Sequence, residues 1–406
     1  MINSIKGNWA LFAGMLMLMA ANGLLVTLLS VRGAAVGMSA SSIGLMQSGY
    51  PLGALAGCVY APRLIARIGH VRAFAALGSL CSITAIVHLL SVDVWTWGAM
   101  RILAGFCFPG LYVISESWLN ARTANTSRAT VLSVYFVVQM AGASAGQALA
   151  GAGEDSGALM FGVASILISL SFLPVLMSHN PAPEYVPPVR MSLRELVSIT
   201  SMGVLGAMLN GAAQATVYIG LPLYGLARGM AASEATLLVV AATLAGAVAQ
   251  FPVGLVSDRW DRRFIVAALA VACTLTSIAL AMGLFGDAVL VAAILLGATV
   301  LPVYSVCVAY ANDHLVPAQI VPASGSLVLS LNVGILVGAF VGPASLEVMG
   351  TVGVPVFLAT LGALTTTVAI VRVLSSAPPE DNGVAHPISA QGVQTVGALH
   401  PEADAQ

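Results

Sequence analysis

Long runs of apolar residues make up most of this chain, and polar positions do not alternate with apolar ones inside them. The first run, from Trp9 to Val31, exceeds the roughly 20 residues that a helix needs to cross a bilayer. Lipid offers the backbone no hydrogen-bond partner, so only helices and closed barrels span it, and unbroken apolar runs favour helices. Turn residues and charges divide the chain into twelve predicted spans, at residues 9–31, 42–62, 73–91, 95–118, 130–150, 158–177, 199–221, 235–256, 264–285, 288–310, 323–346 and 351–374.

The basic residues predict how these spans are oriented. Twelve of them fall on one side of the predicted membrane, namely Lys6, Arg63, Arg67, Arg72, Arg122, Arg128, Arg190, Arg194, Arg259, Arg262, Arg263 and Arg372. Only Arg32 and Arg228 fall on the other side, and Arg101 lies within a span. Because cytoplasmic loops are enriched in Lys and Arg, we expect both termini to be cytoplasmic and the protein to be a multi-pass protein of the inner (cytoplasmic) membrane.

The composition agrees with a membrane protein and argues against several other classes. The chain is 59% hydrophobic and only 8% charged, whereas soluble proteins carry about 25% charged residues. A formal net charge of −1, without a basic stripe, gives no indication of nucleic-acid binding. The five cysteines lie in apolar runs and the histidines lack the spacing of metal ligands, so we expect no metal site. Catalytic motifs are missing too, and we expect no enzyme.

The two halves of the chain repeat each other at an offset of 192 residues, without a gap from residue 37 to residue 146. The stretch "GMSASSIGL" from Gly37 aligns with "GMAASEATL" from Gly229, and Tyr112 aligns with Tyr304. Coincidences of Arg, Tyr, Asn and Cys in one register exceed what similar composition alone produces. Two six-helix halves in the same orientation imply a pseudo-two-fold axis along the membrane normal, with a central crevice between the halves.

The repeat and the loops divide the chain into four parts. Residues 1–178 are predicted to form an N-terminal six-helix bundle, and residues 199–374 a C-terminal one. Residues 179–198 contain four prolines and are predicted to be a cytoplasmic linker. Residues 375–406 are polar and acidic, so we expect a disordered cytoplasmic tail. The predicted fold is therefore an all-α membrane protein with twelve transmembrane helices in two pseudo-symmetric bundles.

Several short motifs resemble the signatures of a known protein family. The stretch "GLVSDRWDRRF", with Gly254, Asp258, Arg259, Arg262 and Arg263, is similar to the loop signature between the second and third helices of a half in the major facilitator superfamily (MFS) of transporters. "RILAGFCFPG" is similar to the Arg-x-x-x-Gly element of the fourth helix. "GILVGAFVGP", which ends at Pro343, is close to a Gly-Pro packing motif that drug antiporters carry in span 5 and this chain carries in span 11. The run "SESWLN" resembles a little-characterised bacterial subgroup.

The resemblance implies a secondary active transporter that moves a small organic solute by alternating access at a central cavity between the halves. Uptake of an anionic metabolite and proton-linked efflux of amphipathic drugs or metabolites both stay open. A non-transporting membrane sensor on the same fold is a further alternative. We expect no cofactor and leave proton coupling open, although no acid occurs in spans 1, 2, 7 and 8. The expected partners are the small-molecule substrate and the lipid bilayer, and the expected state is a monomer.

Arg101 is the most informative single residue, because it lies about two turns inside a predicted span. Intramembrane arginines usually face polar interiors, so we predict that it faces the cavity; the alternative is an arginine whose head reaches the outer headgroups. Asn22 and Gln214 are repeat partners, and such amides serve either a substrate or helix-to-helix hydrogen bonds. The full predicted set of cavity residues is Asn22, Arg101, Tyr112, Asn210, Gln214, Tyr218 and Tyr304.

A second predicted group closes the cytoplasmic side. It consists of Arg67, Glu116, Asp258, Arg259, Arg262 and Arg263. The family resemblance implies a latch between the halves at the last four, and the alternative is an anchor against anionic headgroups. Glu116 is predicted to form an ion pair in this gate, with a proton-carrying role as the alternative. Close helix packing is predicted at Gly142, Gly146, Gly334, Gly338 and Pro343.

Overall fold

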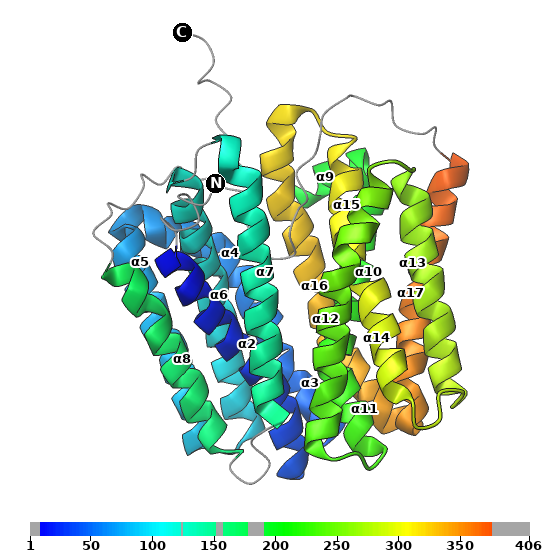
Figure 1. Ribbon diagram of the computed structural model, residues 1–406, viewed down its shortest axis with the longest axis horizontal. Coiled ribbons are helices and arrows are strands. Elements are labelled where there is room, and N and C mark those ends of the chain that lie inside the picture. The colour runs from blue at the N-terminus through cyan, green and yellow to red at the C-terminus, as the bar shows by residue number, and fades with distance from the viewer. Residues whose placement is uncertain (1–8, 123–124, 152–156, 178–190, 376–406) are drawn as a thin grey trace.

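The computed structural model describes residues 9–122, 125–151, 157–177 and 191–375. In these ranges the regular structure is helical, and the helices run up and down along a common direction (Figure 1). The first half contains α2 (Trp9–Ala35), α3 (Ala40–Gln47), α4 (Gly49–Ile68), α5 (His70–Leu90), α6 (Val94–Arg122), α7 (Asn125–Gly151) and α8 (Leu159–Leu176). The second contains α9 (Leu193–Ile199), α10 (Ser201–Ala215), the π-helical η1 (Thr216–Gly220), α11 (Leu221–Ala227), α12 (Ala232–Ser257), α13 (Arg262–Ala281), α14 (Val289–Val300), α15 (Val303–Asn312), α16 (Pro317–Met349), the 3₁₀-helical η2 (Gly350–Val352) and α17 (Gly353–Ser375).

Eight stretches of the described helices are long and apolar enough to cross a membrane. One of these stretches runs through both α16 and α17, and α8 contributes a shorter apolar helix. The all-α class predicted from the sequence is therefore confirmed. The count of twelve spans and the cytoplasmic placement of the termini stay predictions.

The two ends of the bundle serve as reference points below. We call the end at which α2 begins and α17 ends the terminal end, and the opposite end the far end (Figure 1). At the far end α2 and α11 both lead into a glycine of left-handed conformation, with φ of 83° at Gly37 and 82° at Gly229. Side chains with a Cβ rarely adopt this conformation, so the two glycines let the chain turn back at equivalent points of the repeat.

The 192-residue repeat is also a repeat of helix contacts. A Cβ added to Gly146 of α7 would lie 2.7 Å from the backbone nitrogen of Leu24 and nearer still to the carbonyl oxygen of Ala20, both in α2. In the second half, a Cβ added to Gly338 of α16 would lie 2.6 Å from the Cα of Ala212 in α10. Both glycines and both alanines are 192 residues apart, so the same crossing is built twice. Gly142 and Gly334 make the neighbouring contacts one helical turn away.

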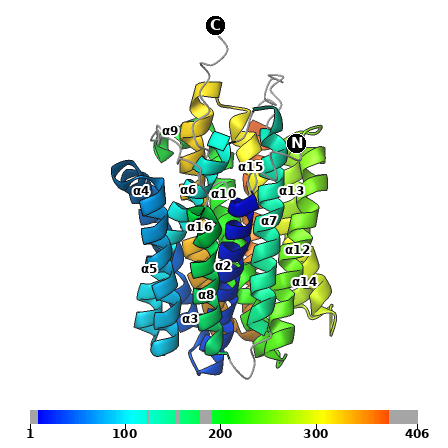
Figure 2. The same ribbon diagram turned by 60° about the vertical axis from the view of Figure 1, so that its left-hand side comes forward.

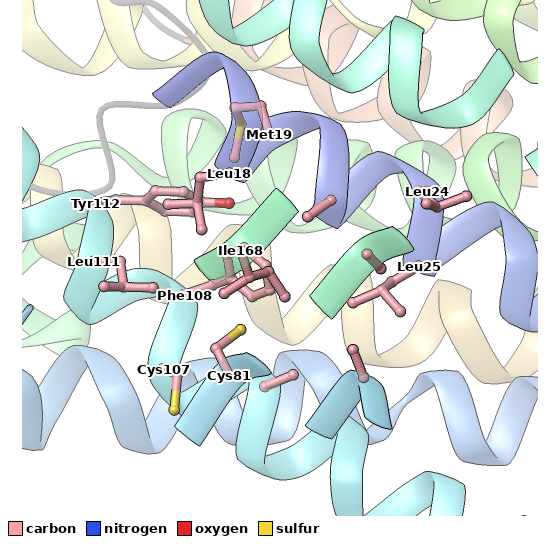
Figure 3. Packing of buried hydrophobic residues seen from close by; sticks show 14 of the residues in the cluster. Leu18, Met19, Leu24, Leu25, Cys81, Cys107, Phe108, Leu111, Tyr112 and Ile168 are labelled. Atoms are coloured by element: carbon pink, nitrogen blue, oxygen red, sulfur yellow. The ribbon is translucent and has the colours of Figure 1, made fainter. Parts of the chain in front are cut away.

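The main core of the first half fills the space between α2, α5, α6 and α8. Leu18 and Leu25 of α2 are each 1% exposed, and Phe108 of α6 and Ile168 of α8 are fully buried. Figure 3 shows these side chains together, with the thiol of Cys81 below them. Each is an apolar position within a predicted span, so the core follows from the apolar pattern once the helices are packed side by side.

The halves lie side by side and touch along two seams. In both views α7 of the first half runs beside α12 of the second (Figures 1 and 2). On the other seam, α3 and α4 contact α16. Within α16, Pro343 lies against the first half, because a Cβ added to Gly44 of α3 would lie 3.2 Å from the Cβ of Pro343. The predicted packing motif around this proline therefore lies at a contact between the halves.

The predicted linker and tail lie largely outside the described residues. Residues 178–190 and 376–406 are not described. The described end of the linker is ordered against the second half, since the Ser326 hydroxyl donates to the carbonyl oxygen of Met191 at 2.5 Å and the Met191 amide donates to Pro322 at 3.3 Å. Leu196 of α9 is fully buried. This part of the linker is thus a packed helix rather than a free connection.

Candidate functional site

Arg101 is buried inside the first half, with only 2% of its surface exposed. Its guanidinium lies over the ring of Tyr50 in α4, 4.5 Å from the ring centroid. Among the described residues, its Nε and Nη1 atoms have no hydrogen-bond partner. A cation–π contact of this kind stabilises by about 0.5–2 kcal/mol. The two nitrogen atoms without a partner leave part of the cost of burying this charge uncompensated.

A row of aromatic rings links Tyr50 to Tyr112, which lies three turns further along α6 than Arg101. The ring centroid of Phe108 lies 6.0 Å from that of Tyr50 and 5.9 Å from that of Tyr112. The Asn22 amide of α2 donates to the Tyr112 hydroxyl at 3.4 Å, and the Asn22 Oδ1 atom has no partner among the described residues. We call Asn22, Tyr50, Arg101 and Tyr112 the Arg101 cluster. All four belong to the first half, and three of them are predicted cavity residues.

Tyr50 is the member that the sequence analysis missed, although a signal was present. Tyr50 lies near the start of the predicted span 42–62, and Arg101 lies near the start of 95–118. The two spans enter the membrane from the same side, so the two residues share a similar depth. Figure 3 shows Tyr112 of the same cluster among the side chains of the apolar core.

The predicted cavity amides of the second half pair with each other and with the backbone. The Asn210 amide of α10 donates to the carbonyl oxygen of Val300 in α14 at 2.7 Å, and the Gln214 amide donates to Asn210 Oδ1 at 2.6 Å. Both side chains are buried, with exposures of 3% and 7%. The bond from Asn210 to α14 is of the helix-to-helix kind that the sequence left as the alternative to substrate binding, whereas the bond from Gln214 to Asn210 lies within α10.

The two predicted cavity tyrosines of the second half lie in different surroundings. Tyr304 of α15 is 6% exposed and packs in an apolar cluster of the second half. Tyr218 in η1 is half-buried and packs instead against the core of the first half. The predicted cavity residues therefore fall into a group around Arg101 and a pair formed by Asn210 and Gln214, while Tyr304 lies in an apolar cluster and Tyr218 lies where the halves meet.

The charged loop between α12 and α13 is paired within the second half. Arg262 contacts Asp313, which caps the end of α15, and lies 3.5 Å from Asp258. Arg263 lies 2.6 Å from Asp261 and also donates to the backbone oxygen of Arg372 in α17 at 3.1 Å. These pairs tie the ends of α13, α15 and α17 together. The latch between the halves predicted for this loop stays a prediction.

Asp261 shows how strongly this loop is organised. Partial burial acts to raise the pKa of its carboxyl, but hydrogen bonds from the side chain and backbone of Arg263 act in the opposite direction. The net pKa of Asp261 lies below its usual value. The same carboxylate accepts from the Arg263 amide at 2.9 Å and so caps the start of α13.

The remaining predicted gate residues differ in burial. Arg67 and Arg259 are exposed, and within the described part of the chain neither forms an ion pair. Glu116 is 2% exposed and lies near Tyr135 of α7. The exposed arginines agree with contacts to headgroups, whereas the burial of Glu116 separates it from that surface.

At the far end, two contacts join the halves. A carboxylate oxygen of Glu347, near the end of α16, accepts from the backbone amide of Ser41 in α3 at 2.9 Å. On the other seam, a Cβ added to Gly151 of α7 would lie 3.2 Å from the Cα of Ser233 in α12. Glu347 is a residue that the sequence analysis did not select. Its partner is 306 positions away in the sequence, and no local sequence pattern predicts such a contact.

Comparison with known proteins places the fold. The sequence profile of the Major Facilitator Superfamily matches residues 10–224 and 203–398. The uncharacterized MFS-type transporter YcaD of Salmonella arizonae is 28% identical over 339 residues, which cover 81% of this chain and 86% of that protein. The uncharacterized MFS-type transporter YE1530 of Yersinia enterocolitica is 26% identical over 298 residues, covering 73% and 77%.

Solved structures show the same arrangement of helices. The nucleoside transporter NupG superposes with a TM-score of 0.73 at 15% identity, over 90% of this chain and 98% of that one. A mutant of NupG gives a TM-score of 0.76 at 12% identity over the same shares. At such low identity the likeness concerns the fold alone. The profile match, which covers most of the chain, carries the assignment: the protein belongs to the Major Facilitator Superfamily and is a multi-pass membrane transporter.

Proposed function

We propose that the protein is a secondary active transporter of the inner membrane that moves a small organic solute by alternating access between its two halves. The observation that carries the proposal is the pair of contacts at the far end, from Glu347 to Ser41 and from Gly151 to Ser233. Both contacts join two helix ends from opposite halves. Such end-to-end contacts can separate by a rocking motion of rigid halves, as transporters of this architecture require.

The distribution of the basic residues supports an orientation in which the far end is the outer side of the membrane. In this proposed orientation, the described contacts close the outer side. The break between α14 and α15 at Pro302 interrupts one helix of the second half near its mid-length, and the π-helical segment η1 interrupts the α-helical pattern between α10 and α11. Interrupted helices are typical of the mid-membrane substrate region in transporters.

Transport is tested with the purified protein in liposomes. We would measure uptake of benzoate, uridine and ethidium, which are an anion, a neutral solute and a cation, each with and without a pH gradient. Uridine is included because the solved neighbour NupG is a nucleoside transporter. We expect saturable uptake of at least one solute above the rate in empty liposomes. Leakage at the empty-liposome rate for all three solutes would contradict the proposal.

The contact between Glu347 and Ser41 also allows a test of alternating access. Cysteines introduced by Ser41→Cys and Glu347→Cys can be bridged with a bismaleimide, which holds the far end closed. Alternating access predicts that the bridge stops uptake, whereas the same reagent on either single variant leaves it unchanged. Full uptake through the bridged protein would rule out this mechanism.

A further inference from the structure

The repeat shows that packing alone does not require the Arg101 cluster. A Cβ added to Gly105 of α6 would lie 2.8 Å from the carbonyl carbon of Tyr50, and a Cβ added to Gly297 of α14 would lie 2.5 Å from that of Ala242. The two glycines are 192 residues apart, and so are Tyr50 and Ala242. The same close helix crossing therefore occurs with a tyrosine in one half and an alanine in the other.

Arg101 differs from its counterpart in the same way. The residue 192 positions later is Ala293, which is 1% exposed, and Ala242 is fully buried. The second half thus fills these two positions with small apolar side chains and forms the same crossing. The first half instead has a buried cation and a half-buried phenol there. Because the helices pack in the same way without them, Tyr50 and Arg101 are not needed for packing, and the pair points to a ligand.

The free hydrogen-bonding atoms define the chemistry of that ligand. Among the described residues, the Nε and Nη1 atoms of Arg101 have no hydrogen-bond partner, and only 2% of the residue is exposed. A planar guanidinium matches a carboxylate in two parallel hydrogen bonds, donated either by Nε and Nη2 or by Nη1 and Nη2. The Tyr112 hydroxyl, which accepts a hydrogen bond from the Asn22 amide at 3.4 Å, supplies a further polar group of the cluster. One cation without a second arginine or lysine in the cluster suits a single negative charge.

The walls of the cluster favour a flat apolar body on that ligand. The rings of Tyr50 and Phe108 lie 6.0 Å apart, and those of Phe108 and Tyr112 lie 5.9 Å apart. Aromatic rings at such distances prefer further aromatic or flat groups in tilted or offset contact. We propose that the Arg101 cluster binds the carboxylate of a singly charged aromatic organic acid, and that such acids are the substrate class of the transporter. This inference rests on the proposed transport function and deepens it.

Binding is measured separately from transport, on the full-length protein in lipid nanodiscs. The probe is benzoate, with benzamide as its uncharged isostere, and the readout is saturable binding by calorimetry. We expect benzoate to bind and benzamide not to bind. Arg101→Met should weaken benzoate binding at least about tenfold, because it removes charge-assisted hydrogen bonds. Arg101→Lys should retain part of the affinity, and Tyr112→Phe should weaken it less than Arg101→Met.

Two further variants separate binding from folding. The double variant Tyr50→Ala, Arg101→Ala copies Ala242 and Ala293 of the second half, so it should fold and yet lose benzoate binding. Thr365→Val removes a buried hydroxyl that bonds within its own helix, and it should leave binding unchanged. Equal binding of benzoate and benzamide, or unchanged benzoate binding in a folded Arg101→Met protein, would overturn the inference.

The transport assay then distinguishes the two proposals. Benzoate binding without uptake of any solute would leave the inference on the ligand intact and contradict the proposed transport function. Uptake of uridine or ethidium without benzoate binding would support transport and overturn the inference. Uptake of benzoate that Arg101→Met abolishes would support both.

Discussion

The contact between α7 and α2 at Gly146 allows a quantitative test of the packing. Replacing this glycine with alanine places a Cβ 2.7 Å from the backbone nitrogen of Leu24 and closer to the backbone of Ala20. Ordinary contact begins at 3.4 Å, so the two helices would have to separate by at least about 0.7 Å. The obstacle is backbone rather than a flexible side chain, so no rotamer change relieves it. Overpacking of this kind costs about 1–3 kcal/mol.

The matched control is a glycine in open space. A Cβ added to Gly162 of α8 meets nothing within 4 Å, and alanine is the better helix former by up to about 1 kcal/mol. Thermal unfolding in detergent should therefore show a lower midpoint for Gly146→Ala and an equal or higher midpoint for Gly162→Ala. Because the repeat forms the same contact at Gly338, the unfolding midpoint of Gly338→Ala should be lowered as well. A Gly146→Ala protein as stable as Gly162→Ala would refute the packing argument.

Other predictions concern single polar contacts and are checked by unfolding measurements. Asp313→Asn removes a partner of the largely buried Arg262 and should lower the free energy of unfolding by about 1.5–3 kcal/mol. Asp258, whose side chain is 55% exposed, contributes less, so Asp258→Asn should lower it by at most about 1 kcal/mol. Equal losses in the two variants would contradict these assignments. Asp261 has a lowered pKa in the folded state, so its contribution to stability is present above its unfolded pKa and is lost as pH falls below about 4. Asp261→Asn should make the free energy of unfolding less dependent on pH in the acid range, and an unchanged pH dependence would contradict this role. Asn210→Ala should cost about 0.6–1.7 kcal/mol, the range for hydrogen bonds between membrane helices, and no loss would mean that its bond to α14 contributes nothing.

The sequence predicts the fold well because lipid makes the rules simple. A helix that crosses a bilayer needs a long apolar run, and such runs are visible without any structure. The repeat likewise predicted which glycines are equivalent, and Gly142, Gly146, Gly334 and Gly338 do lie at close helix crossings. Small residues at a spacing of four are the typical means by which membrane helices approach each other.

The side-chain contacts of the candidate site were harder to predict. An apolar run on all sides of a helix does not fix how the helix rotates about its axis, so Arg101 could face the core, the seam or the headgroups. Its contact with Tyr50 becomes visible only when α4 and α6 are packed. The contact between Glu347 and Ser41 depends on how the two halves meet. Asn210 and Gln214 are close in sequence, but the acceptor of the Asn210 amide is a backbone carbonyl of α14 that no pattern marks.

The most direct test of the account is a distance measurement across the far end. Spin labels at Ala35 and at Val348, which is 83% exposed, report the separation of the halves by pulsed electron paramagnetic resonance in nanodiscs. Alternating access predicts two distance populations, with the longer one enriched by Glu347→Ala, because this variant removes the carboxylate that holds α3. A single narrow population, unchanged by Glu347→Ala, would contradict the movement of the halves on which the proposed function depends.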